Sequence, residues 1–329
     1  MEQRRRIGLI VPSSNTTMET ELPELFRRRE RVAPERFSFH SARMPMTEVT
    51  PEALAAMDHE ADRCAADLAD AACDAMAYAC LVAIMAAGPG AHRRAEQRLS
   101  HVASADGSVR VVTSAGALWE GIRRLDVTRV ALIAPYLPAL TQRVVAYLAD
   151  LGIEVVDHIS LGIADNLAVG RLDPFALLRL LPELNLHRAE ALVLSACVQM
   201  PSLPAIVAAE EMTGLPVLSA ATATALALLE TLRLDPMIEG AGALLGGRAA
   251  ALNEALDKLR GLTPPAKDQS TVTFIVDHLT AVRDDTSGQA AALRTGDTVK
   301  AGQLEARFDG DENIAKNAAN DYGLGDCGA

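Results

Sequence analysis

The chain has 329 residues, a net charge of −12 and five cysteines, and half of its residues are apolar. This composition is typical of a globular protein with one large domain or two ordinary ones, and it excludes a disordered chain. The acidic balance argues against nucleic-acid binding, which depends on clustered Lys and Arg. The irregularly spaced cysteines do not resemble a disulfide framework, so we expect reduced thiols and a cytoplasmic protein.

No targeting or membrane segment is expected. The first apolar run, 7–11, follows three arginines and is too short for a signal peptide. The longest apolar run, 75–87, is shorter than the roughly 18 residues that a membrane-spanning helix needs. We therefore expect no membrane partner.

Short β-branched runs alternate with longer Ala- and Leu-rich segments, which is the pattern of parallel sheets covered by helices in an α/β fold. In chain order, we expect strands at 7–11, 37–41, 75–80, 109–113, 129–134, 153–159, 190–195 and 215–218. We expect helices at 51–72, 115–125, 138–151, 174–184, 202–213 and 220–233. Thr50, Ser114, Asp173 and Ser219 are the predicted helix N-caps, and Thr50 and Asp173 are each followed by a proline.

The chain also repeats itself once at low resolution. The strand at 7–11 and its polar loop match 130–134 and the loop that follows, and 77–80 matches 194–197, each ending in a cysteine. Ligands of open α/β sheets bind at the carboxyl ends of the strands. Two pseudo-equivalent lobes that face each other would therefore bring both cysteines into one cleft.

This repeat gives a predicted division of the chain. The N-terminal lobe comprises 1–115 plus 219–262, and the second lobe comprises 116–218. From 263 to 329 the chain is rich in Asp, Gly, Ala and Asn, and residues 267–329 carry 6 Lys or Arg against 11 Asp or Glu, a net charge of −5. We expect this acidic tail to be poorly structured or to form a small accessory element, with one strand at 271–276.

Cys80 and Cys197 are the candidates for nucleophilic chemistry. Each ends a buried-looking strand just before a helix, where the positive end of the helix dipole would stabilise a thiolate. A lone free cysteine is more often a small buried hydrophobic residue, but a matched pair in an internal repeat favours chemistry. Cys64 and Cys73 fall within one helix pattern and are expected to pack, and Cys327 lies in the tail.

Polar side chains near the same strand ends are candidates for binding an anion. Ser14 and Asn15 follow the first strand, where hydroxyl, amide and loop N–H groups can hold a carboxylate. Tyr136 occupies the equivalent position in the second lobe, and Asn166 lies on a strand-to-helix loop that should reach the same cleft. Taken singly, these residues would be read as an N-cap cluster, a packing tyrosine and a turn residue.

Signatures of metals and cofactors are absent from the sequence. It has no CxxC, no HExxH and no close His pair, and its glycines match neither the dinucleotide nor the phosphate-loop fingerprint. We therefore expect no metal and no cofactor. The scattered histidines also disfavour a Ser–His or Cys–His triad.

Three segments together resemble the maleate cis-trans isomerase family of the aspartate/glutamate racemase superfamily. They are 8–19 (GLIVPSSNTTME), 78–80 (YAC) and 195–199 (SACVQ), and the resemblance extends over roughly 5–235. It implies two Rossmann-like lobes related by a pseudo-twofold axis, an active site in the cleft between them, catalysis without a cofactor, and a homodimer.

The resemblance also implies roles for individual residues. Cys80 would be the nucleophile and Cys197 the partner acid or base. The small dicarboxylate substrate would be bound by Asn15, Tyr136 and Asn166, by the loop of Ser14, and by backbone N–H groups at Leu81, Val82, Val198 and Gln199. Addition of a thiolate to C2 of maleate turns the double bond into a single bond, and rotation followed by expulsion of the thiolate gives fumarate.

Other functions remain open on the sequence alone. An amino-acid racemase could use two opposed cysteines, although no acidic residue beside either cysteine would bind an ammonium group. An arylmalonate-type decarboxylase would be expected to keep only the second cysteine. A small-molecule binding protein shares the two-lobed architecture without the chemistry.

Overall fold

The computed structural model describes residues 4–246 and 269–294, together with residues 303, 307 and 314. The chain forms two compact units, Met1–Leu245 and Gly246–Ala329, and each is described by itself. No helix in the described part of the chain is long and apolar enough to cross a membrane.

The first unit contains two four-stranded parallel sheets with the same strand order, β2-β1-β3-β4 and β6-β5-β7-β8. Their strands are β1 (Arg5–Pro12), β2 (Phe37–Met44), β3 (Ala75–Tyr78), β4 (Arg110–Thr113), β5 (Arg129–Ala134), β6 (Glu154–Ser160), β7 (Ala191–Ser195) and β8 (Val217–Ser219). All eight predicted strands are present, and the predicted α/β fold with two parallel sheets is confirmed. The central strands are buried on both faces, which explains their continuous apolar runs.

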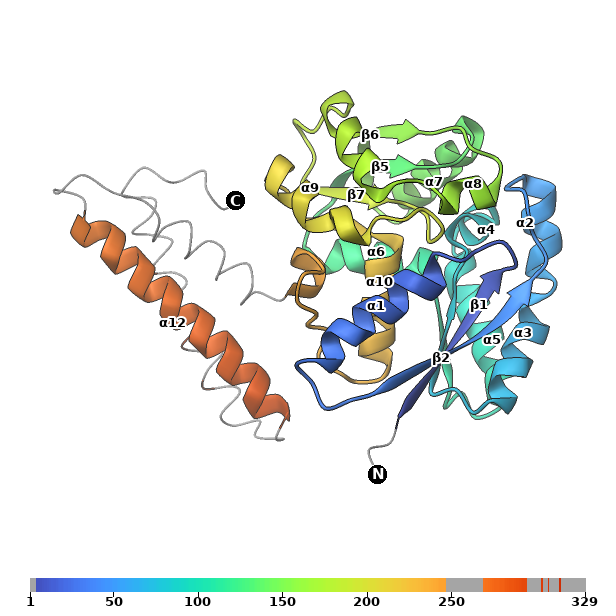
Figure 1. The fold of residues 1–329 in the computed structure, drawn as a ribbon, viewed down its shortest axis with the longest axis horizontal. Helices are drawn as coiled ribbons and strands as arrows, with labels where there is room; N and C mark the ends of the chain where they lie inside the picture. Colours follow the sequence, from blue (N-terminus) through green and yellow to red (C-terminus); the bar gives the residue numbers. More distant parts are fainter. Residues whose placement is uncertain (1–3, 247–268, 295–302, 304–306, 308–313, 315–329) are drawn as a thin grey trace. The chain divides into compact units, whose positions relative to one another are not determined.

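Helices cover both sheets. They are α1 (Met18–Glu30), α2 (Pro51–Asp58), α3 (Ala61–Asp70), α4 (Leu81–Ala86), α5 (Ala91–Ala103), α6 (Ser114–Arg124), α7 (Pro138–Asp150), α8 (Asn166–Gly170), α9 (Ile206–Thr213) and α10 (Ala220–Thr231), with 3-10 helices η1 (Pro174–Glu183) and η2 (Leu203–Ala205). On the first sheet, α1 and α10 lie on one side, and α3 and α5 on the other (Figure 1). Helix α10 also packs against α6, and α4 packs against α7.

Most of the predicted N-caps are confirmed. The side chains of Thr50 and Asp173 each accept a hydrogen bond from the first turn, and Ser219 forms a capping box. The cap predicted at Ser114 is wrong by one residue, because Thr113 is the N-cap and its hydroxyl accepts from an N–H three residues on at 3.0 Å. Ser114 is the first residue of α6.

Three predicted helices differ in form from the expectation. The helix expected at 51–72 is two helices, α2 and α3, separated by a tight turn in which the Glu60 N–H donates to the Met57 carbonyl three residues back at 3.0 Å and the regular helical bonding stops. The helix at 174–184 is a 3-10 helix with Pro182 inside it, and proline removes a helical N–H donor. The helix at 202–213 begins with the short 3-10 turn η2.

The second unit corrects the prediction for the tail. Its described part is helix α12 (Gln269–Arg294), so the strand expected at 271–276 is wrong. That the tail is poorly structured or a small accessory element stays a prediction. The helical spacing i, i+3, i+4, i+7 is followed by the apolar residues Val272, Ile275, Val276 and Leu279. The six residues 271–276 of the expected strand are too few to show this spacing. The rest of 263–329, apart from residues 303, 307 and 314, lies outside the described residues, and the division of 1–262 into two lobes stays a prediction.

Candidate active site

The two predicted cysteines line one small cavity at the carboxyl ends of the strands. Its volume is about 10 Å³, room for about one water molecule. The lining residues are Pro12, Asn15, Met46, Val49, Ala79, Cys80, Leu81, Val82, Tyr136, Asn166, Cys197, Val198 and Gln199. The structure therefore brings together every residue predicted for the site except Ser14.

Cys80 follows β3 and is the N-cap residue of α4. Burial raises the pKa of its thiol to about 12, although a hydrogen bond from the Ala83 N–H acts in the opposite direction. The expectation that the helix N-terminus gives a low pKa is therefore wrong. A six-residue helix supplies few donors, and desolvation of the thiolate outweighs them.

Cys197 follows β7 and lies in a more polar environment. Its Sγ accepts a hydrogen bond from the Gln199 N–H at 3.4 Å, and the Tyr136 hydroxyl also lowers its pKa. Burial still dominates and raises the pKa of Cys197. Both cysteines are therefore thiols at neutral pH.

Asn15 provides a buried hydrogen-bond donor with no protein partner. Its Oδ1 accepts from the Met18 N–H at 3.0 Å, which fixes the orientation of the amide at the start of α1. Its Nδ2 is buried and unpaired, and the residue lines the cavity. A buried polar group without a partner costs free energy, so this donor marks a position where a ligand oxygen would be stabilised.

Tyr136 and Asn166 are positioned by the protein itself. The Tyr136 hydroxyl donates to the Ala196 carbonyl at 2.9 Å, and burial raises its pKa well above the usual value, so it stays protonated. The Asn166 Nδ2 donates to Ser14 Oγ at 2.8 Å. Ser14 in turn donates to the Met46 carbonyl at 2.5 Å. Ser14 therefore lies behind Asn166, outside the cavity lining, and supports it.

The Gln199 side chain joins the loops around the cavity. Its Oε1 accepts from the N–H groups of Thr16 and Thr17 at 3.0 and 3.2 Å. Its Nε2 donates to the carbonyls of Ser14 and Asn166 at 3.0 and 2.9 Å. All of the hydrogen-bonding capacity of this amide is used within the protein, so its backbone N–H is the part that acts on Cys197.

Sequence reasoning missed the apolar cover of the cavity. Met46 and Val49, between β2 and α2, line it, and neighbouring backbone ties this segment to the loop that precedes α8. The Val49 N–H donates to the Ala164 carbonyl at 3.0 Å, and Glu48 forms a β-bridge with Asp165. Apolar side chains in a connecting segment look like ordinary core residues, and no sequence signal separates them.

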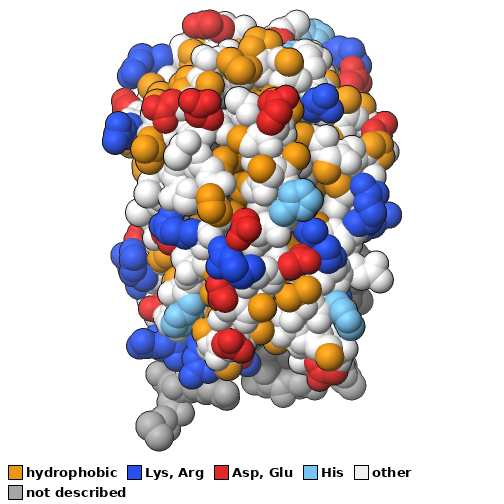
Figure 2. Space-filling view, turned by 90° about the vertical axis from the view of Figure 1, so that its right-hand side faces the viewer, with side chains coloured by type: hydrophobic (Ala, Val, Ile, Leu, Met, Phe, Trp, Pro, Cys, Tyr) orange, Lys and Arg blue, Asp and Glu red, His pale blue; other side chains and the backbone are white. Residues whose placement is uncertain are grey.

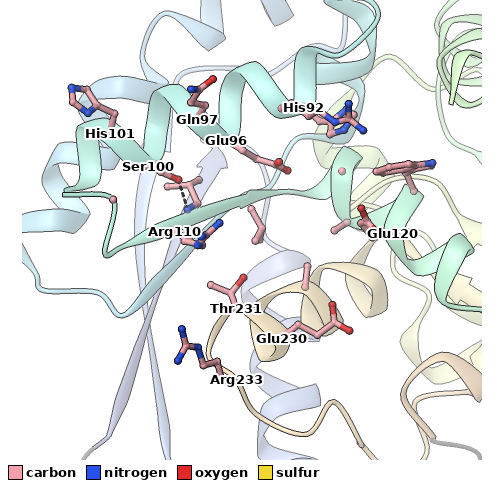
Figure 3. A pocket seen from close by; sticks show the side chains of 18 of the residues that line it. His92, Glu96, Gln97, Ser100, His101, Arg110, Glu120, Glu230, Thr231 and Arg233 are labelled. Carbon is pink, nitrogen blue, oxygen red and sulfur yellow. Dashed lines mark hydrogen bonds between the residues drawn. The ribbon is translucent and has the colours of Figure 1, made fainter. Parts of the chain in front are cut away.

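A much larger cavity lies away from the cysteines, beside the edge strand β4, whose N–H groups at Val111 and Thr113 donate to Ser100 and Glu96 of α5. Its volume is about 1150 Å³, and side chains from α5, β4, α6 and α10 surround it, including His92, Glu96, Arg110 and Glu230 (Figure 3). It is lined by charges of both signs and contains no cysteine. Among the described residues, no group of three His, Cys, Asp or Glu side chains is arranged to hold a metal ion.

Comparisons with known proteins agree with this geometry. A family model described as arylmalonate decarboxylase matches residues 7–245. The curated maleate isomerase of Geobacillus stearothermophilus is 53% identical over 250 residues, covering 75% of this chain and 100% of the relative. The chain belongs to the maleate isomerase family. The prediction that it is an isomerase of this family is therefore confirmed.

Solved structures of maleate isomerases match as well. That of Pseudomonas putida S16, a cysteine-to-alanine variant with maleate, is 51% identical with a TM-score of 0.73, covering 75% of this chain and 99% of that one. That of Nocardia farcinica, a cysteine-to-serine variant with a covalently bound succinylcysteine intermediate, is 47% identical with a TM-score of 0.71, covering 74% and 98%. Arylmalonate decarboxylase itself, 20% identical with a TM-score of 0.57, shares the fold.

Proposed function

We propose that this chain isomerises maleate to fumarate without a cofactor, through a covalent adduct at Cys80. The observation that carries the proposal is one small cavity lined by Cys80, Cys197 and Asn15, whose Nδ2 has no protein partner. The succinylcysteine and maleate found in the two homologous structures support it.

In the proposed reaction, Cys80 Sγ bonds to C2 of maleate, and the π electrons move to C3 and its carboxylate. Asn15 Nδ2 and the N–H groups that follow each cysteine stabilise that charge, and the Tyr136 hydroxyl adds to them when it rotates from the Ala196 carbonyl towards the substrate. Cys197 gives its own proton to C3 and takes up the thiol proton of Cys80, which leaves Cys197 a neutral thiol and a succinyl group on Cys80, and rotation about C2–C3 follows. In the reverse sense, Cys197 takes back the C3 proton and returns a proton to Cys80 Sγ as the Sγ–C2 bond breaks to release fumarate.

Binding of a dianion to an acidic protein must rest on local donors. The net charge is −12, but acidic and basic side chains are interspersed over the face on which Figure 2 looks. The cavity residues contribute amides, hydroxyls, thiols and backbone N–H groups, and none of their side chains is acidic. Short-range hydrogen bonds in a buried site are screened less than the field of the distant surface charges.

The test measures fumarate formed from maleate by the wild type and by Cys80→Ser and Cys197→Ser. We expect activity in the wild type alone, and a covalent adduct with the mass of one maleic acid on Cys80 in Cys197→Ser. Cys64→Ser, which replaces a buried packing cysteine, is the matched control and should stay active. Full activity in Cys80→Ser would overturn the assignment of the nucleophile.

The alternative functions predict different results for the same purified wild-type protein. A racemase would produce no fumarate but would exchange the α-proton of an amino acid in heavy water. A binding protein would bind a small anion with no turnover. The cavity favours the isomerase over the racemase, because no acidic side chain lines it to hold an ammonium group.

We also propose a cytoplasmic homodimer. The described cysteines Cys64, Cys73, Cys80 and Cys197 are all free thiols. In the sheet β2-β1-β3-β4, β4 is an edge strand, and we assign the large cavity beside it, lined by charges of both signs, to the contact with a second copy of the chain. Light scattering should give twice the monomer mass, and Arg110→Glu on β4 should lower it.

A further inference from the structure

Asp58, the last residue of α2, accepts hydrogen bonds from two other elements. The Tyr78 hydroxyl, from β3, donates to its Oδ1 at 2.9 Å. One guanidinium nitrogen of Arg98, from α5, lies 3.2 and 3.1 Å from its two oxygens. This carboxylate therefore ties the end of α2 to the first sheet and to the helix beyond it.

The bond from Tyr78 is the stronger part of this connection. Tyr78 is 0% exposed and lies two residues before Cys80, and burial raises its pKa well above the usual value, so its hydroxyl remains a donor. A hydrogen bond to a carboxylate is stronger than one between neutral groups. Arg98 and Asp58 are both more than a third exposed, so solvent weakens their ion pair.

The segment that ends at Asp58 also covers the cavity. Met46 and Val49 line the cavity, and Leu54 and Met57 are buried, with α2 packed on α4, the helix that begins after Cys80. The loops around Ser14 and 164–166 hold the start of this segment. A cavity for one water admits a dicarboxylate only when some part of its wall moves.

We propose that Tyr78 and Arg98 are positioning residues that act through Asp58 as a latch, holding the segment 46–58 closed over Cys80. Helix α2 lies on the outside of the first unit, so it can move without breaking either sheet (Figure 1). Release of Asp58 leaves the Tyr78 hydroxyl without its partner, which opposes opening. The inference rests on the proposed function only for the identity of the ligand that enters.

The test measures alkylation of Cys80 by iodoacetamide, followed by peptide mass spectrometry, in the full-length protein. If Cys80 reacts only when the segment opens, its rate follows the open fraction. Tyr78→Phe keeps the ring and removes the hydroxyl, and we expect an increase of about fivefold. Arg98→Gln should increase the alkylation rate of Cys80 about two- to threefold, and the double variant should increase it about tenfold or more.

The controls separate opening from other effects. Tyr147→Phe removes another buried phenol hydroxyl, which contacts His92, and Arg27→Gln removes a surface ion pair, so neither should change the rate at Cys80. Cys64 and Cys73 are read in the same digest, and general loosening of the fold would accelerate them too. The Asp58 carboxylate raises the pKa of Cys80, and loss of the Arg98 cation removes its ion-pair partner, so electrostatics alone would slow the reaction at Cys80.

An unchanged Cys80 rate in folded Tyr78→Phe and double variants, or an equal rise at Cys64, would overturn the latch. Alkylation needs no turnover. If the wild type forms no fumarate, the proposed function is wrong, but the alkylation test of the latch can still be carried out. Protection of Cys80 from alkylation by maleate would identify the ligand independently of turnover.

Discussion

The two polar atoms of the Asn15 side chain have different roles: its oxygen caps a helix, and its nitrogen is the donor for the substrate binding that we propose. Oδ1 caps the start of α1 through Met18, and Nδ2 is buried without a protein partner. Sequence analysis found the residue from its place after the first strand, but the same position also fits an ordinary N-cap. The unpaired donor supports the binding role that we propose, because an oxygen atom inside the cavity would satisfy it.

Replacing Asn15 by Asp separates these two ends. The carboxylate keeps an acceptor for the Met18 N–H, but it removes the donor and places negative charge against the substrate. We expect kcat/KM for maleate to fall by about a hundredfold or more, the value of a charge-assisted hydrogen bond. The melting temperature should fall as well, because Asn15 is buried and a carboxylate loses more solvation there than an amide does. Asn185→Asp is the matched control, since Asn185 also accepts from a backbone N–H outside the cavity. Activity retained in Asn15→Asp would contradict this role.

The raised pKa of Cys80 gives a pH dependence with a definite sign. Because burial raises the pKa to about 12, the thiolate fraction rises about tenfold for each pH unit through the neutral and alkaline range. Alkylation of Cys80 should therefore increase up to at least pH 10 without levelling off. A short unstructured peptide thiol, measured alongside, levels off near its ordinary pKa of about 8.5. An alkylation rate of Cys80 that levels off below pH 9 would show that the helix N-terminus lowers the pKa of the thiol more than burial raises it.

At the scale of elements, the polar bridges around the site depend on single buried side chains. Glu21 of α1 is 6% exposed and accepts from the N–H groups of Ser202 and Leu203, both at 2.6 Å. It thereby connects α1 to the turn that begins η2. Gln199 makes a comparable connection between the first-strand loop and Asn166.

Glu21→Ala should destabilise the fold more than it impairs chemistry. It leaves two buried N–H groups without an acceptor, and we expect the free energy of unfolding to fall by about 2–4 kcal/mol in urea denaturation. Glu21→Gln keeps an acceptor and should cost less. Glu24→Ala removes an exposed, ion-paired glutamate of the same helix and should change stability by less than about 1 kcal/mol. Equal losses of unfolding free energy in the Glu21→Ala and Glu24→Ala variants would show that the Glu21 bridge stabilises the fold no more than an exposed ion pair does.

At the scale of the whole molecule, the catalytic unit and the second unit separate in the sequence. The family match ends at residue 245, where the first unit ends, and the residues that line the cavity lie between 12 and 199. Nothing in the described site comes from α12.

Truncation after Leu262 should therefore leave the fold and the isomerase activity intact. We expect kcat/KM within about twofold of the full chain and an unchanged fold by circular dichroism. The full-length chain, expressed and purified in parallel, is the control. Loss of folding or of activity in the truncated protein would show that the second unit supports the first.

The sequence by itself determined the eight strands, the family and the pair Cys80 and Cys197, because each of these depends on a local pattern. Buried parallel strands are continuous apolar runs, and the internal repeat marks the matching strand ends at which the two cysteines lie. It missed the break after Asp58, the supporting role of Ser14, and the cover formed by Met46 and Val49. Only the tertiary structure decided these, because hydrogen bonds between distant segments fix where the chain turns and which side chains meet. The pKa of Cys80 was decided in the same way, because desolvation depends on everything packed around the thiol, and no local motif encodes it.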